Sequence, residues 1–397
     1  MERRVGTVSR GIRCPIIREG DNLAEIVVDS VIKAGESDGF QLRDRDVIAV
    51  TESVVARSQG NYVSVDTIGE DVRRKFGGET VGVIFPILSR NRFAICLKGI
   101  ARGVKKIVLM LSYPRDEVGN ELLTLDQLDE REIDPYATVL TLEQYREYFG
   151  ANLHPFTGVD YVQYYSDLIK AEGAEVEVIF ANQAKEILNH TKNVLCCDIH
   201  TRKRTKRILK ALGAEKVYGL DDIMTESING SGYNSQYGLL GSNKATENSV
   251  KLFPNDCTDL VSEIQASILE KTGKHVEVMV YGDGAFKDPV GQIWELADPT
   301  VSPASTEGLK GTPNELKLKY LADNDFSQLS GAELREAISN RIREKDKNLV
   351  GKMESEGTTP RQLTDLIGSL CDLTSGSGDK GTPVVLVQGY FDNYTND

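Results

Sequence analysis

Residues 276–289 read VEVMVYGDGAFKDP, and they lead from an apolar strand into a flexible, charged corner. Valines alternate with other residues from position 276 to position 281, which is the two-residue period of a β-strand. The strand ends at Gly282-Asp283-Gly284, and glycine lets a backbone take positive φ angles and approach a ligand closely. The corner is therefore either an ordinary turn or one wall of a binding site.

Asp283 presents a carboxylate at the end of this strand, and Asp288 and Glu295 follow it closely. Hard divalent cations such as Mg²⁺ are held by one or two carboxylates together with nucleotide phosphates, and Mn²⁺ prefers similar oxygen ligands. Asp283 with one of the two later acids fits such a site, and Lys287 is placed to face phosphate oxygens. A Gly-Asp-Gly turn without a ligand is the alternative.

The overall composition is that of a folded, enzyme-sized protein. The 397 residues are 40% apolar and their mean hydropathy is −0.30. The net charge of −13 argues against nucleic-acid partners, because phosphates are neutralised by basic surfaces. The first residues lack the apolar segment of a signal peptide, and no run approaches about 18 apolar residues. We therefore expect a cytoplasmic protein without a membrane span.

Six cysteines and four histidines are scattered along the chain without Cys-x-x-Cys spacing. This distribution does not favour a zinc site or a disulfide framework. Buried, reduced thiols are the expected state of these cysteines.

The middle of the chain, from about residue 102 to residue 222, alternates apolar strands with helices. Strand–helix–strand alternation with nearly continuous apolar strands predicts a parallel, doubly wound sheet. This block is expected to form a domain of its own. A polar, glycine-rich stretch follows at 226–249 and predicts a mobile or ligand-facing loop outside the core. A helix is then expected at 257–272, leading into the strand of the opening stretch.

One strand of the middle block leads into a basic segment. The carboxyl ends of strands in open sheets and the N-termini of helices both favour anions, so Arg202 and Arg204 are candidates for binding a phosphate group. A solvated helix face or a subunit contact is the alternative, because no glycine-rich phosphate loop is present. The basic residues are Arg202, Lys203, Arg204, Lys206, Arg207 and Lys210.

Three separated parts of the chain resemble the coenzyme F-420-0:L-glutamate ligase (gamma-glutamyl ligase) family. Residues 17–31 and 46–61 are similar to the family's opening helix and to its first strand and turn. Residues 269–292 are similar to its later helix, buried strand and Ser-Asp-Thr corner. The ending GSGDKGTPVVLVQG, at 376–389, resembles its closing glycine-rich loop and final strand.

This chain departs from the family pattern in its first turn. The family has Lys, Ser, Lys and Glu where this chain has Ser53, Ala56, Arg57 and Gln59, so charge is kept only at Arg57.

It departs again at the family's metal-binding loop, Asn-Ala-Gly-Ile-Asp, which is best matched here by GSNKATENS. Asn243 aligns with the family's asparagine, whereas the aspartate position falls on Thr246 or Glu247. The later corner keeps its aspartate as Asp283 and has Gly284 in place of threonine.

The resemblance implies an α+β fold in which residues 1–95 and 237–397 form a discontinuous ligase-like domain. Residues 96–236 would then be an inserted, Rossmann-like α/β domain. The resemblance also implies a homodimeric ligase that uses GTP or ATP with Mg²⁺ or Mn²⁺. A small-molecule carboxylate would be converted to an acyl phosphate, and the amine of L-glutamate would displace the phosphate. Such phosphoryl transfer depends on positioning and on cations that neutralise developing charge.

Transferred residue by residue, the resemblance makes Asp283 and Glu247 the candidate metal ligands. Lys287 and Arg57 become the candidate catalytic cations. The candidate nucleotide or substrate contacts are Ser53, Asn243 and Lys244, to which the basic segment adds Arg202 and Arg204.

Two other functions stay open at this stage. The chain could be a binding or regulatory protein that keeps the fold without catalysis, which the altered metal loop favours. The middle block could also be an independent module for nucleotides or sugar phosphates. Within the ligase interpretation we expect an acceptor other than the coenzyme itself, because members of the family also occur where that coenzyme is not expected.

Overall fold

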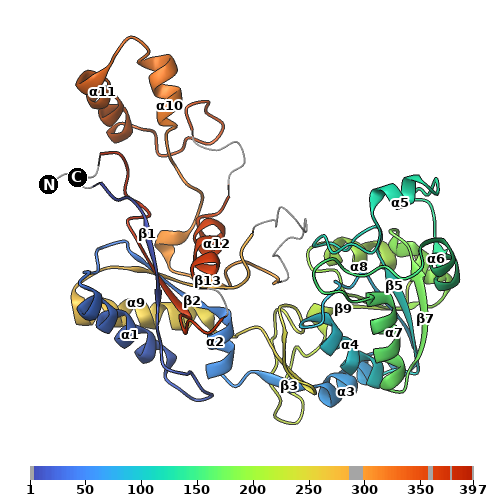
Figure 1. Cartoon of the computed structure of the whole chain (residues 1–397). Coiled ribbons are helices and arrows are strands. Elements are labelled where there is room, and N and C mark those ends of the chain that lie inside the picture. The colour runs from blue at the N-terminus through green and yellow to red at the C-terminus, as the bar shows by residue number, and fades with distance from the viewer. Residues whose placement is uncertain (1–3, 286–297, 356–360, 376–377, 396–397) are drawn as a thin grey trace.

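The structure is a computed structural model that describes residues 4–285, 298–355, 361–375 and 378–395. Two large units, each built on a sheet, are joined by a small sheet, and a helical lobe projects from the first unit (Figure 1). Lys287, Asp288 and Glu295 lie outside the described residues.

The first unit is built on a five-stranded mixed sheet in the order β1-β14-β2-β12-β13. β2 and β12 run parallel, and the other neighbouring pairs are antiparallel. The strand expected in the opening stretch is confirmed as β12. The strands are β1 (Val8–Ile12), β2 (Val47–Thr51), β12 (Glu277–Tyr281), β13 (Ala304–Ser305) and β14 (Val384–Gln388).

Side chains of β12 alternate between two cores on opposite faces of this sheet. Val278 and Val280 pack with α1 and α9, whereas Met279 and Tyr281 pack with α12. Because side chains alternate along a strand, slipping β12 by one residue would exchange the side chains that the two cores receive. The helices of this unit are α1 (Leu23–Asp38), α2 (Glu52–Ser58), α9 (Cys257–Thr272) and α12 (Leu363–Ser375), with a 3₁₀ turn η3 (Glu307–Leu309).

The second unit contains a six-stranded sheet in the order β6-β7-β5-β4-β8-β9. Five strands are parallel, and the short β6 pairs antiparallel at the edge. Numbered along the chain, the parallel strands have the order 3-2-1-4-5 that is typical of dinucleotide-binding folds. The parallel sheet predicted for the middle block is therefore present. Its strands are β4 (Thr80–Ile84), β5 (Lys106–Leu111), β6 (Leu140–Thr141), β7 (Glu175–Phe180), β8 (Asn193–Cys196) and β9 (Lys216–Gly219).

Helices cover both faces of the second sheet, as expected for a doubly wound fold. One face carries α3 (Val65–Phe76), α4 (Phe93–Arg102) and α7 (Tyr161–Ala171). The other carries α8 (Arg202–Ala211) and η1 (Ala184–Asn189), a 3₁₀ segment. The remaining helical segments of this unit are α5 (Leu125–Asp129), α6 (Leu142–Phe149) and the 3₁₀ turn η2 (Leu220–Asp222).

This sheet extends across the expected domain boundary at residues 95 and 96. That boundary falls inside α4, and both β4 and α3 precede it. β4 is a central strand, hydrogen-bonded to β5 and β8. The α/β unit therefore begins earlier in the chain than the strand–helix alternation suggested.

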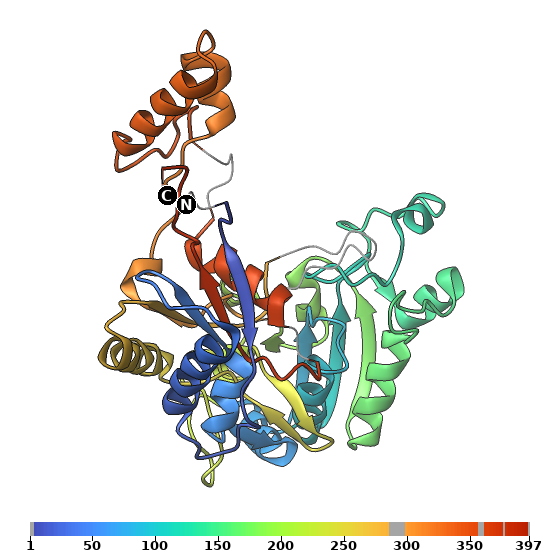
Figure 2. The ribbon, with the colours of Figure 1, turned by 60° about the vertical axis from the view of Figure 1, so that its left-hand side comes forward.

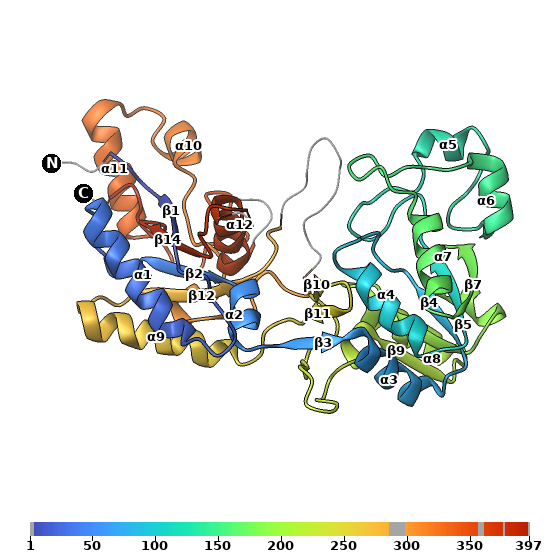
Figure 3. The same cartoon turned by 60° about the horizontal axis from the view of Figure 1, so that its bottom comes forward.

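A small antiparallel sheet in the order β10-β11-β3 lies between the two units (Figure 3). The expectation that residues 226–249 stay outside the core was wrong for part of this stretch. Leu239 and Leu240 are each 2% exposed and pack into the core of the second unit. The prediction failed because it rested on the polar composition of the whole stretch, which does not reveal two adjacent leucines. The strands are β3 (Tyr62–Ser64), β10 (Asn243–Thr246) and β11 (Ser249–Lys251).

The helical lobe stands away from both sheets (Figure 2). It consists of α10 (Leu318–Tyr320), the π-helical turn η4 (Leu321–Asp325) and α11 (Gly331–Arg343) around its own small core. No helix within the described parts of the chain has the length and apolar character needed to cross a membrane.

Asp116, in the loop after β5, anchors the segment that follows β4. Its buried carboxylate accepts hydrogen bonds from the backbone N–H groups of Leu88 (2.8 Å), Val118 (3.1 Å) and Asn120 (2.8 Å), and from the Asn120 side chain (2.7 Å). Burial raises the pKa of Asp116 to about 6, against these hydrogen bonds. The segment after β4 is thus fixed by a carboxylate from the loop that follows the neighbouring strand β5.

Replacing this carboxylate by an amide is expected to be costly. In Asp116→Asn, the amide NH₂ replaces one acceptor oxygen and faces donors, so the free energy of unfolding should fall by about 2–4 kcal/mol. Urea unfolding followed by circular dichroism measures the change, with the exposed Asp129→Asn as control. A change within about 0.5 kcal/mol, as for ordinary surface substitutions, would contradict this role.

Candidate active site

A cavity of about 1090 Å³ opens beside the carboxyl ends of the parallel strands β2 and β12. In open α/β sheets, ligands bind at the carboxyl ends of parallel strands. The cavity walls come from parts of the chain that are far apart in sequence. They are residues 14–19, the start of α2, the β10–β11 hairpin, the corner at Gly282 and Asp283, the end of α12 and residues 378–383.

Five of the residues selected from the sequence line this one cavity. They are Ser53, Arg57, Asn243, Lys244 and Asp283. Ser53 and Arg57 come from α2, Asn243 and Lys244 from β10, and Asp283 from the corner after β12. Arg57 donates a hydrogen bond from Nε to the Ile17 carbonyl oxygen (2.6 Å), which ties α2 to the neighbouring wall. The roles proposed for these residues are all compatible with this common location.

Glu247, the second candidate metal ligand, lies outside the cavity lining. Its side chain is 81% exposed and forms an ion pair with Lys244 on the β10–β11 hairpin. This ion pair lowers the pKa of Glu247. Its assignment as a metal ligand stays a prediction that this location does not favour.

Arg92 joins the two large units at the edge of the cavity. Its guanidinium contacts the carboxylate of Asp283 at 2.5 Å and that of Asp298 at 2.6 Å. The Asp283 backbone N–H also donates to Asp298 (2.9 Å). Burial opposes the charge on Arg92, but Asp298 and Asp283 outweigh it and raise the pKa of Arg92 above its ordinary value. Asp298 is 2% exposed, so Arg92 neutralises a carboxylate that water cannot reach.

Glu52 and Lys251 form a second charged pair in the cavity. Lys251 Nζ lies 3.6 Å from Glu52 Oε2 and donates a hydrogen bond to Ser53 Oγ (2.7 Å). Both side chains are buried, with exposed fractions of 7% for Glu52 and 10% for Lys251. Desolvation raises the pKa of Glu52 to about 7, although Lys251 acts in the opposite direction.

The carboxylates on the cavity wall have the chemistry of a site for Mg²⁺ or Mn²⁺. Asp283 and Asp372 both line the cavity, and the Gly284 backbone N–H donates to Asp372 (3.2 Å). Burial raises the pKa of Asp372. Within the described ranges, no group of three or more histidine, cysteine, aspartate or glutamate residues is arranged around a common metal position. One or two carboxylates are enough when nucleotide phosphates supply further ligands, so the donor set fits a metal shared with a nucleotide.

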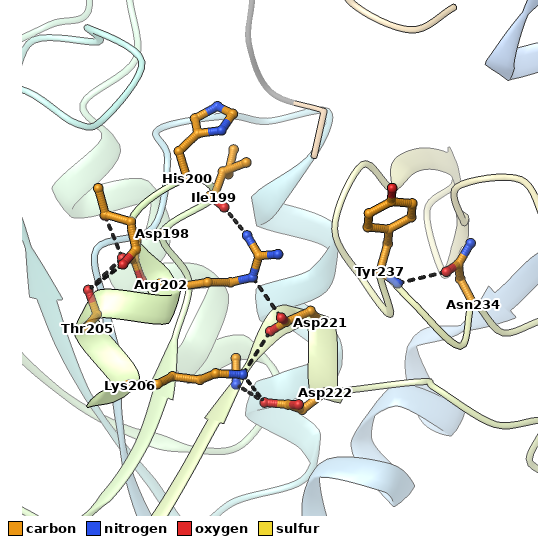
Figure 4. Close-up of polar contacts among 12 residues, drawn as sticks. Asp198, Ile199, His200, Arg202, Thr205, Lys206, Asp221, Asp222, Asn234 and Tyr237 are labelled. Atoms are coloured by element: carbon orange, nitrogen blue, oxygen red, sulfur yellow. Dashed lines mark hydrogen bonds and ion pairs between the residues drawn. The ribbon is translucent and has the colours of Figure 1, made fainter. Parts of the chain in front are cut away.

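The basic segment lies elsewhere, at the carboxyl ends of β8 and β9 (Figure 4). Arg202 contacts Asp221 at 2.9 Å, and Lys206 contacts Asp221 at 3.3 Å and Asp222 at 2.7 Å. Arg204 is exposed on α8. Arg202 and Arg204 are therefore not brought to the cavity, and Arg202 is already paired with an acid of its own unit.

The turn that leads into α8 holds an anion supplied by the chain itself. The Glu117 carboxylate accepts hydrogen bonds from the backbone N–H groups of Ile199 (2.6 Å), His200 (3.0 Å) and Thr201 (2.9 Å). Backbone N–H groups at such a turn are where a phosphate would bind in related α/β folds. The hypothesis of a phosphate site in the middle block therefore gains no support from this geometry.

Four residues of the cavity were not predicted from the sequence: Glu52, Arg92, Lys251 and Asp372. Glu52 could have been predicted from the sequence, because an acidic residue directly after an apolar strand is a site candidate. Asp283 was selected for the same reason, although one glycine separates it from its strand. Lys251 lies between the apolar residues Val250 and Leu252, a pattern typical of a solvent-facing strand position, yet its side chain is only 10% exposed. Arg92 has no local signal, because its partners lie about 200 residues away, at separations of 191 and 206 positions.

Comparison with known proteins places the chain in a family. The family model described as F420-0:Gamma-glutamyl ligase matches residues 11–389, a range that includes the six-stranded sheet, the five-stranded sheet except the start of β1, and every described residue of the cavity wall. No curated protein matches the sequence significantly. The match covers nearly the whole chain and agrees with the resemblance seen in three separate segments. This chain therefore belongs to the F420-0:Gamma-glutamyl ligase family.

Proposed function

We propose that this cavity adds L-glutamate to a small-molecule carboxylate in a nucleotide- and divalent-metal-dependent reaction. The observation that carries the proposal is the convergence of five predicted site residues, from three separate segments of the chain, on one cavity. Membership in a gamma-glutamyl ligase family supports an amide-forming ligase. The nucleotide, the metal and the acyl phosphate intermediate are parts of the proposal.

The cations of the cavity are suited to binding anions. Arg57 on α2 and Lys244 on β10 both line the wall, and Lys251 lies beside Ser53. Transfer of a phosphoryl group to a carboxylate brings together two negatively charged reactants. Positive side chains that are already in place lower the barrier because they need not reorganise during the reaction.

Asp283 and Asp372 would hold the divalent ion, Mg²⁺ or Mn²⁺, which neutralises charge on the nucleotide phosphates when bound. Asp283 is engaged by Arg92 in this structure. Arg92 therefore sets the orientation of Asp283 and supplies a fixed positive charge next to it. Asn243 and Ser53 contribute neutral polar contacts at the same wall.

The acceptor is proposed to be a small-molecule carboxylate other than the coenzyme, bound with help from the α/β unit. We further propose a cytoplasmic homodimer that takes GTP or ATP. The charge of −13 is consistent with small-molecule partners rather than nucleic acid.

Nucleotide binding is the first test. Isothermal titration calorimetry with ATP and GTP, with and without Mn²⁺, should show metal-dependent binding of one nucleotide to the wild type. Asp283→Ala should abolish the metal dependence. Asp283→Asn retains an oxygen acceptor for Arg92 but should also lose the metal dependence. This variant therefore separates the effect of the Asp283 charge from the effect of its contact with Arg92. Asp38→Ala, at an exposed end of α1, serves as control and should bind as the wild type does.

Absence of nucleotide binding to folded protein would overturn the ligase proposal. The alternative would then be a ligand-binding or regulatory protein on the same scaffold. The Arg92–Asp283 contact favours that alternative, because the Arg92 guanidinium occupies the carboxylate that a divalent ion would need as a ligand.

A further inference from the structure

Glu52 occupies an unusual position for a carboxylate. It is the first residue of α2, immediately after the central strand β2, and it lines the cavity. Its side chain is 7% exposed, and its Oε2 atom has no hydrogen-bond partner among the described residues. Buried carboxylate oxygens are normally hydrogen-bonded, so an orphaned one at a cavity wall indicates a group that meets a ligand.

The charges around Glu52 come from four different parts of the chain. Lys251 on β11 is 3.6 Å away, and Arg92 before α4 adds a second positive charge. Asp298 is the negative neighbour, and the thiol of Cys257 on α9 lies within electrostatic range. Desolvation dominates and raises the pKa of Glu52 to about 7. A carboxyl group in this environment can both take up and release a proton near neutral pH.

Amide formation needs such a group. The amine of an amino acid is protonated at neutral pH and becomes a nucleophile only after it loses a proton. Two other acids of the cavity are engaged, since Arg92 contacts Asp283 and the Gly284 backbone N–H donates to Asp372. The side chain of Glu52 lines the cavity, its orphaned oxygen is buried, and Lys251 lies nearby to stabilise the ionised form.

We propose that Glu52 is the proton acceptor for the amine that attacks the activated carboxylate. This inference rests on the function proposed above. The Glu52 carboxylate takes one proton from the ammonium group, and the neutral amine nitrogen attacks the carbonyl carbon of the acyl phosphate. A C–N bond forms, the C–O bond to phosphate breaks, and inorganic phosphate leaves with the bonding electron pair and takes up the second proton that the nitrogen loses as it becomes an amide. Lys251 is the positioning residue, because it holds Ser53 and faces Glu52.

The test compares two nucleophiles in wild type and Glu52→Gln, with a panel of small-molecule carboxylates as acceptor probes. Hydroxylamine is largely neutral at pH 7 and traps acyl phosphates without a base, whereas L-glutamate needs one. Glu52→Gln should lose about 10²–10⁴-fold in the rate of glutamate addition while hydroxamate formation stays within a few-fold. The wild-type rate with glutamate should rise through a pH of about 7, and the variant should lack this inflection. Exposed Glu270→Gln on α9 is the control and should match the wild type.

The outcomes separate the two proposals. If the wild type forms hydroxamate and glutamate amide and Glu52→Gln does both with an unchanged pH profile, the inference is wrong and the ligase function stands. If Glu52→Gln loses both products equally, Glu52 acts before amine attack and the inference is again overturned. If the wild type forms neither product with any of the acceptor probes, whether ATP or GTP is supplied, the proposed function fails and the inference fails with it.

Discussion

Arg92→Met should lower the free energy of unfolding by about 3–5 kcal/mol, the usual cost of removing one partner from a buried ion pair. The Arg92 side chain is 18% exposed, and its partner Asp298 is 2% exposed. Methionine approximates the length of the arginine stem, so most of the packing is retained while the charge is lost. Asp298 would then be a buried carboxylate without its cation.

Chemical unfolding of the wild type and Arg92→Met measures this effect. Exposed Arg90→Met, two positions earlier in the same loop, should change the free energy of unfolding by less than about 0.5 kcal/mol. Combining Arg92→Met with Asp298→Asn should recover part of the loss, because the double variant no longer buries an unpaired charge. A fully additive double variant would show that the two side chains do not interact.

Glu52→Gln is expected to stabilise the protein above neutral pH. The pKa of Glu52 rises from 4.5 to about 7 on folding, so between these values the folded state binds more protons than the unfolded state. The stability contributed by the protonated group is complete below about pH 4.5 and is lost as the pH rises through about 7. At about 1.4 kcal/mol per pKa unit, ionised Glu52 costs the folded state about 3 kcal/mol at pH 8, and a neutral glutamine avoids that cost.

Unfolding free energies of wild type and Glu52→Gln at pH 5 and pH 8 test this linkage. The variant should exceed the wild type by about 2–3 kcal/mol at pH 8, and most of the difference should disappear at pH 5. A variant that is less stable at both values would mean that Glu52 is held ionised by Lys251 as an ordinary structural pair. The predicted gain agrees with the general finding that active-site residues are placed at a cost in stability.

Much of the fold could be predicted from local pattern. The alternation at 276–281 gave β12, and the strand–helix alternation of the middle block gave the parallel sheet. Periodicity is a local property, and burying an apolar face is the main reason each element forms, so the sequence carries this information directly. The start of the second unit was misplaced because β4 precedes the regular alternation and shows no sign of its partners.

Some residues of the candidate site could likewise be predicted from the sequence, and others could not. Asp283, Ser53 and Asn243 could be selected because strand ends, turns and a family resemblance mark them in the sequence. Glu52, Arg92 and Lys251 became visible only in the tertiary structure, because their properties come from neighbours distant in the chain. Arg92 meets Asp298 across 206 positions, and Lys251 meets Ser53 across 198.

The sequence by itself thus determined which segments form strands and helices, the family of the chain, and which strand end carries the conspicuous aspartate. Only the tertiary structure decided which charges are buried together and therefore which carboxyl group can exchange a proton near neutral pH. The physical reason is that hydrophobic periodicity is encoded within a few residues. Desolvation and charge pairing, in contrast, depend on every group that packing brings within a few ångströms.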